Sequence, residues 1–374
     1  MTDVRRWTVP GRVNLIGEHL DYNGGPVLPM AIDRSMTIKA RARDDGVVNL
    51  WTDREGTSRA TFPTTVQPGD VDAWAAYAAG TVWSLAQAGH SFTGVDLVVK
   101  SGLPSGAGLS SSAALTCGIA AAIDELFGLG LGRTDLALVA QHAESDFVGA
   151  PVGLMDQLAV LYGTAGHAVL MDTAASPPTT RTVPITWDDD GLVLLVINTR
   201  AHHSLADGEY AARRDECERA TTELGITWLA EAGLDAMVKL DDETLKARAR
   251  HVLTETARVR GAVNAMSRRA WPQLGTIFTA SHASLRDDFQ VSCPELDVAV
   301  DAAVEAGALG ARMTGGGFGG SAIALVPLDL VATVREKVEV RYAAHQWPAP
   351  EVFVVHAADG AHLESDEAPP APRP

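Results

Sequence analysis

Three short segments of the chain gather residue types that could bind and process a small polar ligand. The first, residues 11–25, reads GRVNLIGEHLDYNGG and places Arg12, Glu18, His19 and Asp21 between glycines. Each hydroxyl of a polyhydroxylated ligand needs a donor and an acceptor, and a carboxylate is a strong acceptor. This density of hydrogen-bonding groups suits a polyhydroxyl ligand, although a solvated loop has a similar composition.

A second segment, residues 103–113, has the features of an anion-binding loop. It reads LPSGAGLSSSA and runs directly into an apolar helical stretch. Glycines let backbone N–H groups approach a phosphate closely, and the start of a helix adds unpaired N–H donors. The loop lacks the lysine of a Walker A motif and the second glycine of a nucleophile elbow. The alternative is a serine-capped buried helix that follows a turn.

A third segment, residues 313–321, is a glycine cluster that reads MTGGGFGGS. Gly315, Gly317 and Gly320 form a literal GxGxxG, but an apolar strand-like stretch follows where a dinucleotide-binding fingerprint needs a helix. Dinucleotide binding is therefore rejected. The glycines instead indicate a backbone that turns sharply or passes very close to a ligand or another part of the chain.

In their order and spacing, the three segments together resemble the GHMP small-molecule kinases, and the first is similar to the galactokinase signature of that family. The resemblance covers the chain up to its tail. It implies a two-domain α+β fold, with ATP and a sugar bound in the cleft between the domains. It also implies transfer of the γ-phosphoryl group of Mg-ATP to the anomeric C1 hydroxyl of α-D-galactose.

The same resemblance assigns roles to individual residues of this sequence. Asp156, in GLMDQ, matches the catalytic base, with Arg12 beside it, although base catalysis and mere orientation of the hydroxyl both stay open. The positions that match sugar-binding residues are Arg12, Glu18, His19, Asp21, Gly153, Asp156 and Tyr210. The positions that match the triphosphate cradle are Ser105, Gly106, Ala107, Gly108, Leu109, Ser110, Ser111 and Ser112. Ser112 and Glu144 match the Mg²⁺ ligands, and the cleft is lined by Gly315, Gly316 and Gly317.

Two positions depart from the galactokinase pattern. Leu20 stands where GEHT has a threonine, and Val152 stands where a cysteine usually precedes the glycine of the GLMDQ stretch. Both changes are expected to make the sugar pocket more apolar, so N-acetylgalactosamine or arabinose is an alternative substrate. A non-catalytic sugar and ATP sensor is disfavoured because the serine loop and Asp156 are intact. A mevalonate or homoserine kinase has no use for the sugar signature.

Strands and helices alternate along the whole chain. Period-two alternation or short apolar runs predict strands over residues 36–42, 47–51, 94–100, 191–198, 321–328 and 352–358. Helical spacing predicts helices over residues 74–85, 113–128, 134–145, 155–158, 207–223, 242–267, 293–306 and 328–340. Gly128 is expected to end the second of these helices and Thr134 to cap the third.

The division into domains is read from composition. Residues 173–190 are rich in Thr, Pro and Asp and form the best candidate boundary, although a long surface loop fits as well. We expect an N-terminal domain over 1–187, a C-terminal domain over 188–364 and a disordered, proline-rich tail over 365–374. A length of 374 residues agrees with about two domains.

Composition limits the partners. With 30 basic and 47 acidic side chains, the formal charge of −17 disfavours nucleic acid. Neither a membrane span nor a signal peptide is evident, which predicts a cytoplasmic protein. A monomer or a weak homo-oligomer is expected. The three cysteines are far apart and are predicted to be buried free thiols rather than a disulfide or zinc site.

Overall fold

The computed structural model describes residues 4–53, 59–72, 74–104, 106–150, 152–202, 206–233 and 235–364. The predicted disordered tail over 365–374 and Ser105 of the phosphate loop lie outside the described residues. The three cysteines are buried free thiols, as the sequence predicts. Within the described part of the chain, no helix is both long and apolar enough to span a bilayer.

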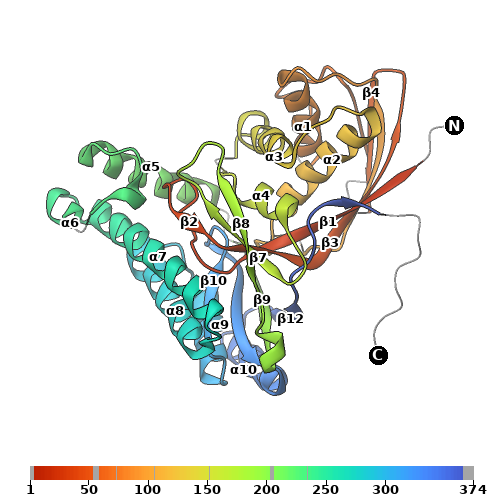
Figure 1. Ribbon diagram of the computed structural model, residues 1–374. Coiled ribbons are helices and arrows are strands. Elements are labelled where there is room, and N and C mark those ends of the chain that lie inside the picture. Colours follow the sequence, from red (N-terminus) through yellow and green to blue (C-terminus); the bar gives the residue numbers. More distant parts are fainter. Residues whose placement is uncertain are drawn as a thin grey trace.

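The N-terminal half is built on a six-stranded sheet, with helices packed on it (Figure 1). Its strand order is β13-β1-β3-β6-β4-β5, and the neighbours are antiparallel except for β4 and β6. The strands are β1 (Arg5–Asn14), β3 (Pro29–Ala42), β4 (Val47–Thr52), β5 (Arg59–Pro63), β6 (Val95–Ser101) and β13 (His362–Leu363). The helices of this half are α1 (Ala75–Gln87), α2 (Ser111–Phe127), α3 (Arg133–His142) and α4 (Met155–Tyr162).

Helix α2 packs directly on this sheet. It is apolar nearly all round because β1 and β3 contact one side of it while α1, α3 and α4 contact the others. Gly118 permits the close approach, since a Cβ there would lie 2.6 Å from both Val9 Cγ2 and Ile38 Cδ1. The helix ends at Gly128, whose φ of 63° is left-handed, which confirms the predicted stop.

The start and the end of α3 differ from the prediction. Gly132, not Thr134, occupies the N-cap, and its backbone N–H donates to the Asp135 carboxylate at 3.0 Å. The Thr134 hydroxyl instead bonds the hydroxyl of Tyr162 at 2.7 Å. After His142 the α-helix gives way to a π-helical turn, Ala143–Val148, which carries Glu144. Threonine is favoured at the N-cap position of a helix, but in this fold the Thr134 hydroxyl makes a tertiary contact with Tyr162 instead.

The C-terminal half is built on an antiparallel four-stranded sheet of order β10-β11-β9-β12. Helices α8 and α9 pack on it, and α10 packs on α9. Helix α7 is the long helix that runs beside α8 in Figure 1. The strands are β9 (Leu192–His202), β10 (Gly310–Thr314), β11 (Gly319–Pro327) and β12 (Glu351–Val355). The helices are α5 (Ala206–Leu224), α6 (Ala236–Lys239), α7 (Glu243–Ser267), α8 (Trp271–Ser284), α9 (Pro294–Glu305) and α10 (Val331–Ala344).

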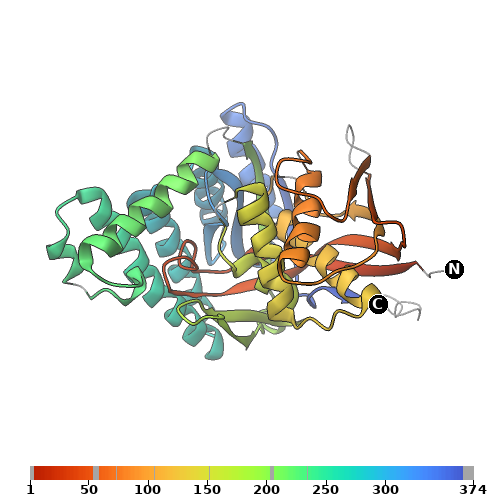
Figure 2. The ribbon, with the colours of Figure 1, turned by 90° about the horizontal axis from the view of Figure 1, so that it is seen from above.

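A small third sheet joins segments that are distant in the sequence. It consists of β2 (Pro26–Val27), β7 (His167–Asp172) and β8 (Thr179–Pro184). Strand β8 lies inside the segment that the sequence predicts to be a boundary loop. The sequence does not reveal this strand, because only Val183 of it is buried and its other residues are nearly all polar. The first and last strands of the described residues, β1 and β13, pair with each other, and Figure 2 shows the halves side by side with α5 and α6 projecting outward.

Candidate active site

A bidentate ion pair joins the first strand to the start of α4. Arg12, near the end of β1, donates from Nε to Oδ1 of Asp156 and from Nη2 to Oδ2, both at 2.7 Å. Its Nη1 donates to the carbonyl oxygen of Gly108 at 2.6 Å. The Arg12 side chain is 5% exposed, whereas that of Asp156 is 28% exposed. The arginine is therefore a buried support that holds a carboxylate facing open space.

The ion pair lies in the wall of a cavity of about 190 Å³. Residues from both halves of the chain line it: Arg12, Glu18, His19, Asp21, Val152, Gly153, Met155, Asp156, Tyr210, Gly315 and Gly316. The structure thus brings together every residue that the sequence predicts for the sugar. Of the cleft glycines, Gly317 is not in this lining; a Cβ there would lie 2.3 Å from the Val291 carbonyl oxygen, so it serves a tight backbone approach.

Asp21 and Gly153 depend on each other. A Cβ on Gly153 would lie 1.9 Å from Oδ2 of Asp21, so a larger residue there would displace this carboxylate from its present position. Burial raises the pKa of Asp21 to about 6, and the nearby negative charge of Asp156 adds to the increase. The cavity lining therefore contains three carboxylates, Glu18, Asp21 and Asp156, and the proximity of Asp156 makes the charged form of Asp21 less favourable.

His19 is held in a left-handed backbone conformation with φ of 63°. Its Nδ1 lies 2.9 Å from the Tyr22 hydroxyl, and its ring centroid lies 4.6 Å from that of Phe289 and 5.4 Å from that of Tyr210. Burial lowers the pKa of His19 to about 3, so the ring is neutral at pH 7. A hydrogen bond between the ring and the Gly316 backbone, in the glycine cluster, offsets part of that decrease.

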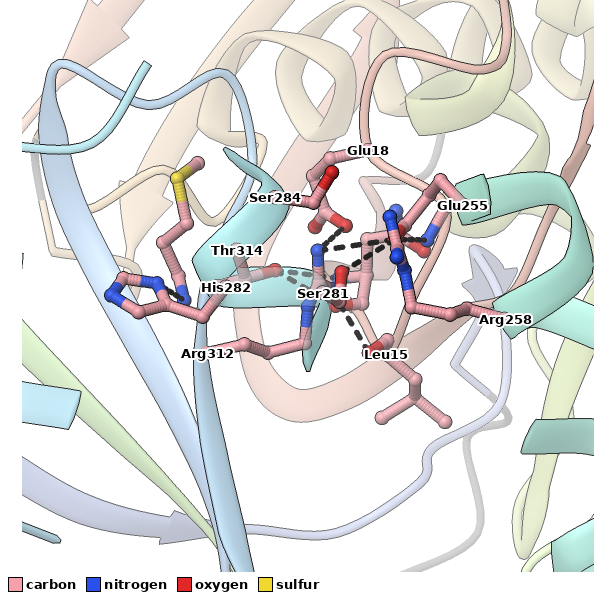
Figure 3. Close-up of polar contacts among 12 residues, drawn as sticks. Leu15, Glu18, Glu255, Arg258, Ser281, His282, Ser284, Arg312 and Thr314 are labelled. Atoms are coloured by element: carbon pink, nitrogen blue, oxygen red, sulfur yellow. Dashed lines mark hydrogen bonds and ion pairs between the residues drawn. The ribbon is translucent and has the colours of Figure 1, made fainter. Parts of the chain in front are cut away.

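Glu18 is held in place by a buried cluster of charged residues that the sequence does not predict. Its Oε2 binds Nη2 of Arg312 on β10, and its Oε1 accepts from the Gly315 backbone N–H at 3.1 Å. Figure 3 shows Arg312 reaching between Glu18 and Glu255 of α7, with Glu255 Oε1 3.7 Å from Nη2. Burial raises the pKa of Glu18, and Arg312 offsets part of that increase. Through Glu18, this charged cluster holds the Gly315 backbone of the glycine cluster in the wall of the cavity.

Glu255 receives several donors of its own. Arg258 Nε donates to it at 2.6 Å, and the Ser281 hydroxyl also donates to it at 2.6 Å. Burial alone would raise the pKa of Glu255, but Arg312, His251 and Arg258 lower it to about 2. The cluster therefore combines two carboxylates with two guanidinium groups, which balances its charge in the interior.

The two departures from the galactokinase pattern have different positions. Val152 lines the cavity, as predicted. Leu20 does not; its side chain is fully buried in the hydrophobic core and packs against Gly25. The prediction that Leu20 makes the sugar pocket more apolar is therefore wrong, because this position faces the interior although its sequence neighbours face the cavity.

The serine-rich loop lies between the sugar cavity and a second cavity. Gly106 and Gly108 have φ values of 68° and 69°, and the Ser321 hydroxyl donates to the Ala107 carbonyl at 2.6 Å. Leu109 is buried. The second cavity, of about 310 Å³, is lined by Met36, Thr52, Trp74, Tyr77, Val99, Ser101, Ser111, Ser112 and Leu115. The sequence predicts Ser111 and Ser112 of this cavity but not Trp74 and Tyr77, because these two aromatic residues look like the apolar face of a helix.

Ser112 and Glu144 face each other beside the loop. Glu144 accepts from the Thr116 hydroxyl at 3.1 Å and from Gln157 Nε2 at 2.9 Å. Burial raises the pKa of Glu144 to about 7, although hydrogen bonds from Ser112 and Gln157 offset part of the increase. A buried carboxylate with no adjacent basic side chain among these partners, next to a hydroxyl, fits Mg²⁺, which takes one or two protein oxygens together with phosphates.

Family models match all three sequence segments. The models for the GHMP kinases N terminal domain and the GHMP kinases C terminal match residues 76–164 and 262–344. The galactokinase galactose-binding signature matches residues 2–42. A galactokinase of Streptomyces coelicolor is 45% identical over 361 residues, which are 95% of this chain and 93% of that protein. The chain belongs to the galactokinase family.

Further relatives agree with the family. A galactokinase of Mycobacterium tuberculosis is 43% identical over 94% of this chain and 97% of its own. The crystal structure of Lactococcus lactis galactokinase complexed with galactose superposes with a TM-score of 0.91 at 33% identity, over 96% of this chain and 95% of that one. The resemblance to GHMP kinases and the expected α+β fold of this galactokinase family member are confirmed.

Proposed function

We propose that the chain is a galactokinase that transfers the γ-phosphoryl group of ATP to the C1 hydroxyl of α-D-galactose, giving galactose 1-phosphate and ADP. The observation that carries the proposal is the Arg12–Asp156 pair in the wall of a polar cavity that the galactose-binding signature lines. Phosphoryl transfer needs positioning, charge neutralisation and a destination for the hydroxyl proton. The sugar cavity and the phosphate loop would position the two substrates, Arg12 would neutralise charge, and the Asp156 carboxylate would accept the proton.

Arg12 and Asp156 share the chemical work in this proposal. Asp156 accepts the hydrogen bond of the C1 hydroxyl and takes its proton as the new P–O bond forms. Arg12 orients that carboxylate through two hydrogen bonds, and its Nη1 also donates to the Gly108 carbonyl. One N–H on each Nη atom is left to donate to a phosphoryl oxygen. Glu18, His19, Asp21, Gly153 and Tyr210 would hold the other hydroxyls, because all line the same cavity.

The nucleotide is proposed to occupy the loop and the second cavity. The backbone of residues 105–112 would cradle the triphosphate, and Trp74 and Tyr77 offer aromatic surface to the base. Ser112 and Glu144 would hold Mg²⁺, which neutralises phosphate charge when it is bound. Both are within reach of the loop, since Ser112 lines the cavity and bonds Glu144.

Several expectations stay proposals alongside this function. They are the domain limits of 1–187 and 188–364, a cytoplasmic location, and a monomer or weak homo-oligomer with no nucleic-acid or membrane partner. A related sugar is the second candidate substrate, and Val152 favours it because this apolar side chain lines the cavity.

The test is ADP release from Mg-ATP with a panel of galactose, N-acetylgalactosamine, arabinose and glucose, with mevalonate as a control. Galactose is expected to give the highest kcat/KM. Asp156→Asn is expected to bind ATP and galactose while losing most turnover. Preference for another sugar would reassign the substrate, and near-normal turnover by Asp156→Asn would remove the base role.

A further inference from the structure

Ser110 does not direct its hydroxyl toward the phosphate side of the loop. Its Oγ donates to Oδ2 of Asp156 at 2.5 Å. The residue is the N-cap of α2, yet its side chain caps no helix N–H group. The backbone is left-handed, with φ of 58°, a conformation that is strained for a non-glycine residue. This strained conformation accompanies a side chain that contacts Asp156.

The hydrogen bonds to Asp156 are unequal on its two oxygens. Oδ2 accepts from Nη2 of Arg12 and from the Ser110 hydroxyl, which together fill the acceptor sites of that oxygen. Oδ1 accepts only from Nε of Arg12 among the residues that the structure describes. The side chain keeps 28% exposure and lines the sugar cavity, so the open acceptor site is on Oδ1.

We propose that Ser110 is a positioning residue for Asp156 rather than a ligand of the triphosphate, and that it makes Oδ1 the oxygen that receives the sugar proton. The inference rests on the proposed function. In the step, the C1 oxygen forms a bond to the γ-phosphorus while the bond from that phosphorus to the bridging oxygen of ADP breaks. The hydroxyl proton moves to Oδ1, and Oδ2 stays bonded to Ser110 and Arg12.

Two variants at the same position separate the hydroxyl from the backbone. Ser110→Ala removes the hydroxyl and keeps a side chain at positive φ, whereas Ser110→Gly removes the hydroxyl and relieves the strain. A hydrogen bond to a charged group is worth about 1.5–3 kcal/mol, which corresponds to about 10- to 150-fold in rate. Both variants are therefore expected to lose kcat by about 10- to 100-fold, with KM for ATP within about twofold of wild type.

Ser111→Ala is the matched comparison, because Ser111 is the neighbouring hydroxyl on the nucleotide cavity and forms no hydrogen bond with Asp156 among the described residues. It is expected to raise KM for ATP more than it lowers kcat. Calorimetric titration of each variant with ATP alone gives binding without turnover.

Three results would overturn the positioning role. A raised KM for ATP with normal kcat in Ser110→Ala would make Ser110 a ligand of the triphosphate. Normal kcat in Ser110→Gly would show that only the backbone matters. An equal loss of kcat in Ser111→Ala would make the effect unspecific to Asp156. Wild-type turnover on the sugar panel tests the proposed function separately, so the two failures cannot be confused.

Discussion

Removing Arg312 is the sharpest perturbation of the buried cluster. The guanidinium is fully buried, it pairs with a Glu18 side chain that is 1% exposed, and it also donates to the Leu15 carbonyl at 3.0 Å. Arg312→Met keeps an apolar stem but leaves Glu18 without a cation. Glu255 keeps Arg258 at 2.6 Å, so the variant leaves one uncompensated carboxylate and not two.

Breaking a buried ion pair from one side costs about 3–5 kcal/mol, out of a total stability of about 5–15 kcal/mol. Arg312→Met is therefore expected to lose about 3–5 kcal/mol in urea unfolding at pH 7.5, followed by tryptophan fluorescence. Burial raises the pKa of Glu18, so the folded state tolerates this carboxyl best when it is protonated. The stability lost in Arg312→Met is therefore largest at pH values above the pKa of Glu18, and the loss decreases as the pH falls through that pKa.

Arg312→Met with Glu18→Gln is the matched control, since it removes the orphaned charge along with the arginine. This double variant is expected to recover most of the lost stability. The reasoning fails if Arg312→Met unfolds within about 1 kcal/mol of wild type, or if Glu18→Gln does not rescue it. In either case Arg312 and Glu18 would contribute to stability through packing alone and not through their charges.

Three further predictions concern the cavity and the metal. Gly153→Ala places a Cβ 1.9 Å from Oδ2 of Asp21, so KM for galactose should rise at least about tenfold while KM for ATP stays unchanged. An unchanged KM for galactose, or an equal rise in KM for both substrates, would contradict this clash. Because the pKa of Asp21 is about 6, KM for galactose should rise as pH falls through 6, where Asp21 loses its charge near Asp156 and Arg12. A KM–pH profile that Asp21→Asn does not flatten would rule out Asp21 as the titrating group. Ser112→Ala and Glu144→Gln should each raise the Mg²⁺ concentration needed for half-maximal ADP release, and unchanged titrations would exclude them as ligands.

Much of the site could be predicted because its residues lie in contiguous motifs. Arg12 and Asp156 are far apart in the sequence, and only the resemblance to a family placed them together; the structure joins them because α4 packs on β1. Their contact needs a tertiary arrangement that no local period encodes. Leu20 shows the converse, since it lies within the motif yet its side chain belongs to the core.

The buried cluster was missed although the sequence carries signals for it. Arg312 is a charge inside an apolar strand, GARMT, and Glu255 lies on the apolar stripe of α7 between Val252 and Val259. A charge at such a position must be paired, but sequence alone does not say with what. The short strand β8 and the helix α8 were missed for a different reason, since their apolar residues are few or are broken by small polar ones.

The pairing of β13 with β1 has a consequence for synthesis of the chain. Trp7 stands opposite Leu363, so β1 gains its second neighbour only from nearly the last described residues. A growing chain on the ribosome can already contain the phosphate loop and Asp156 while β1 still forms an open edge. An open edge can pair with another chain, so the first sheet stays vulnerable to aggregation until residues 362 and 363 have been synthesised and paired.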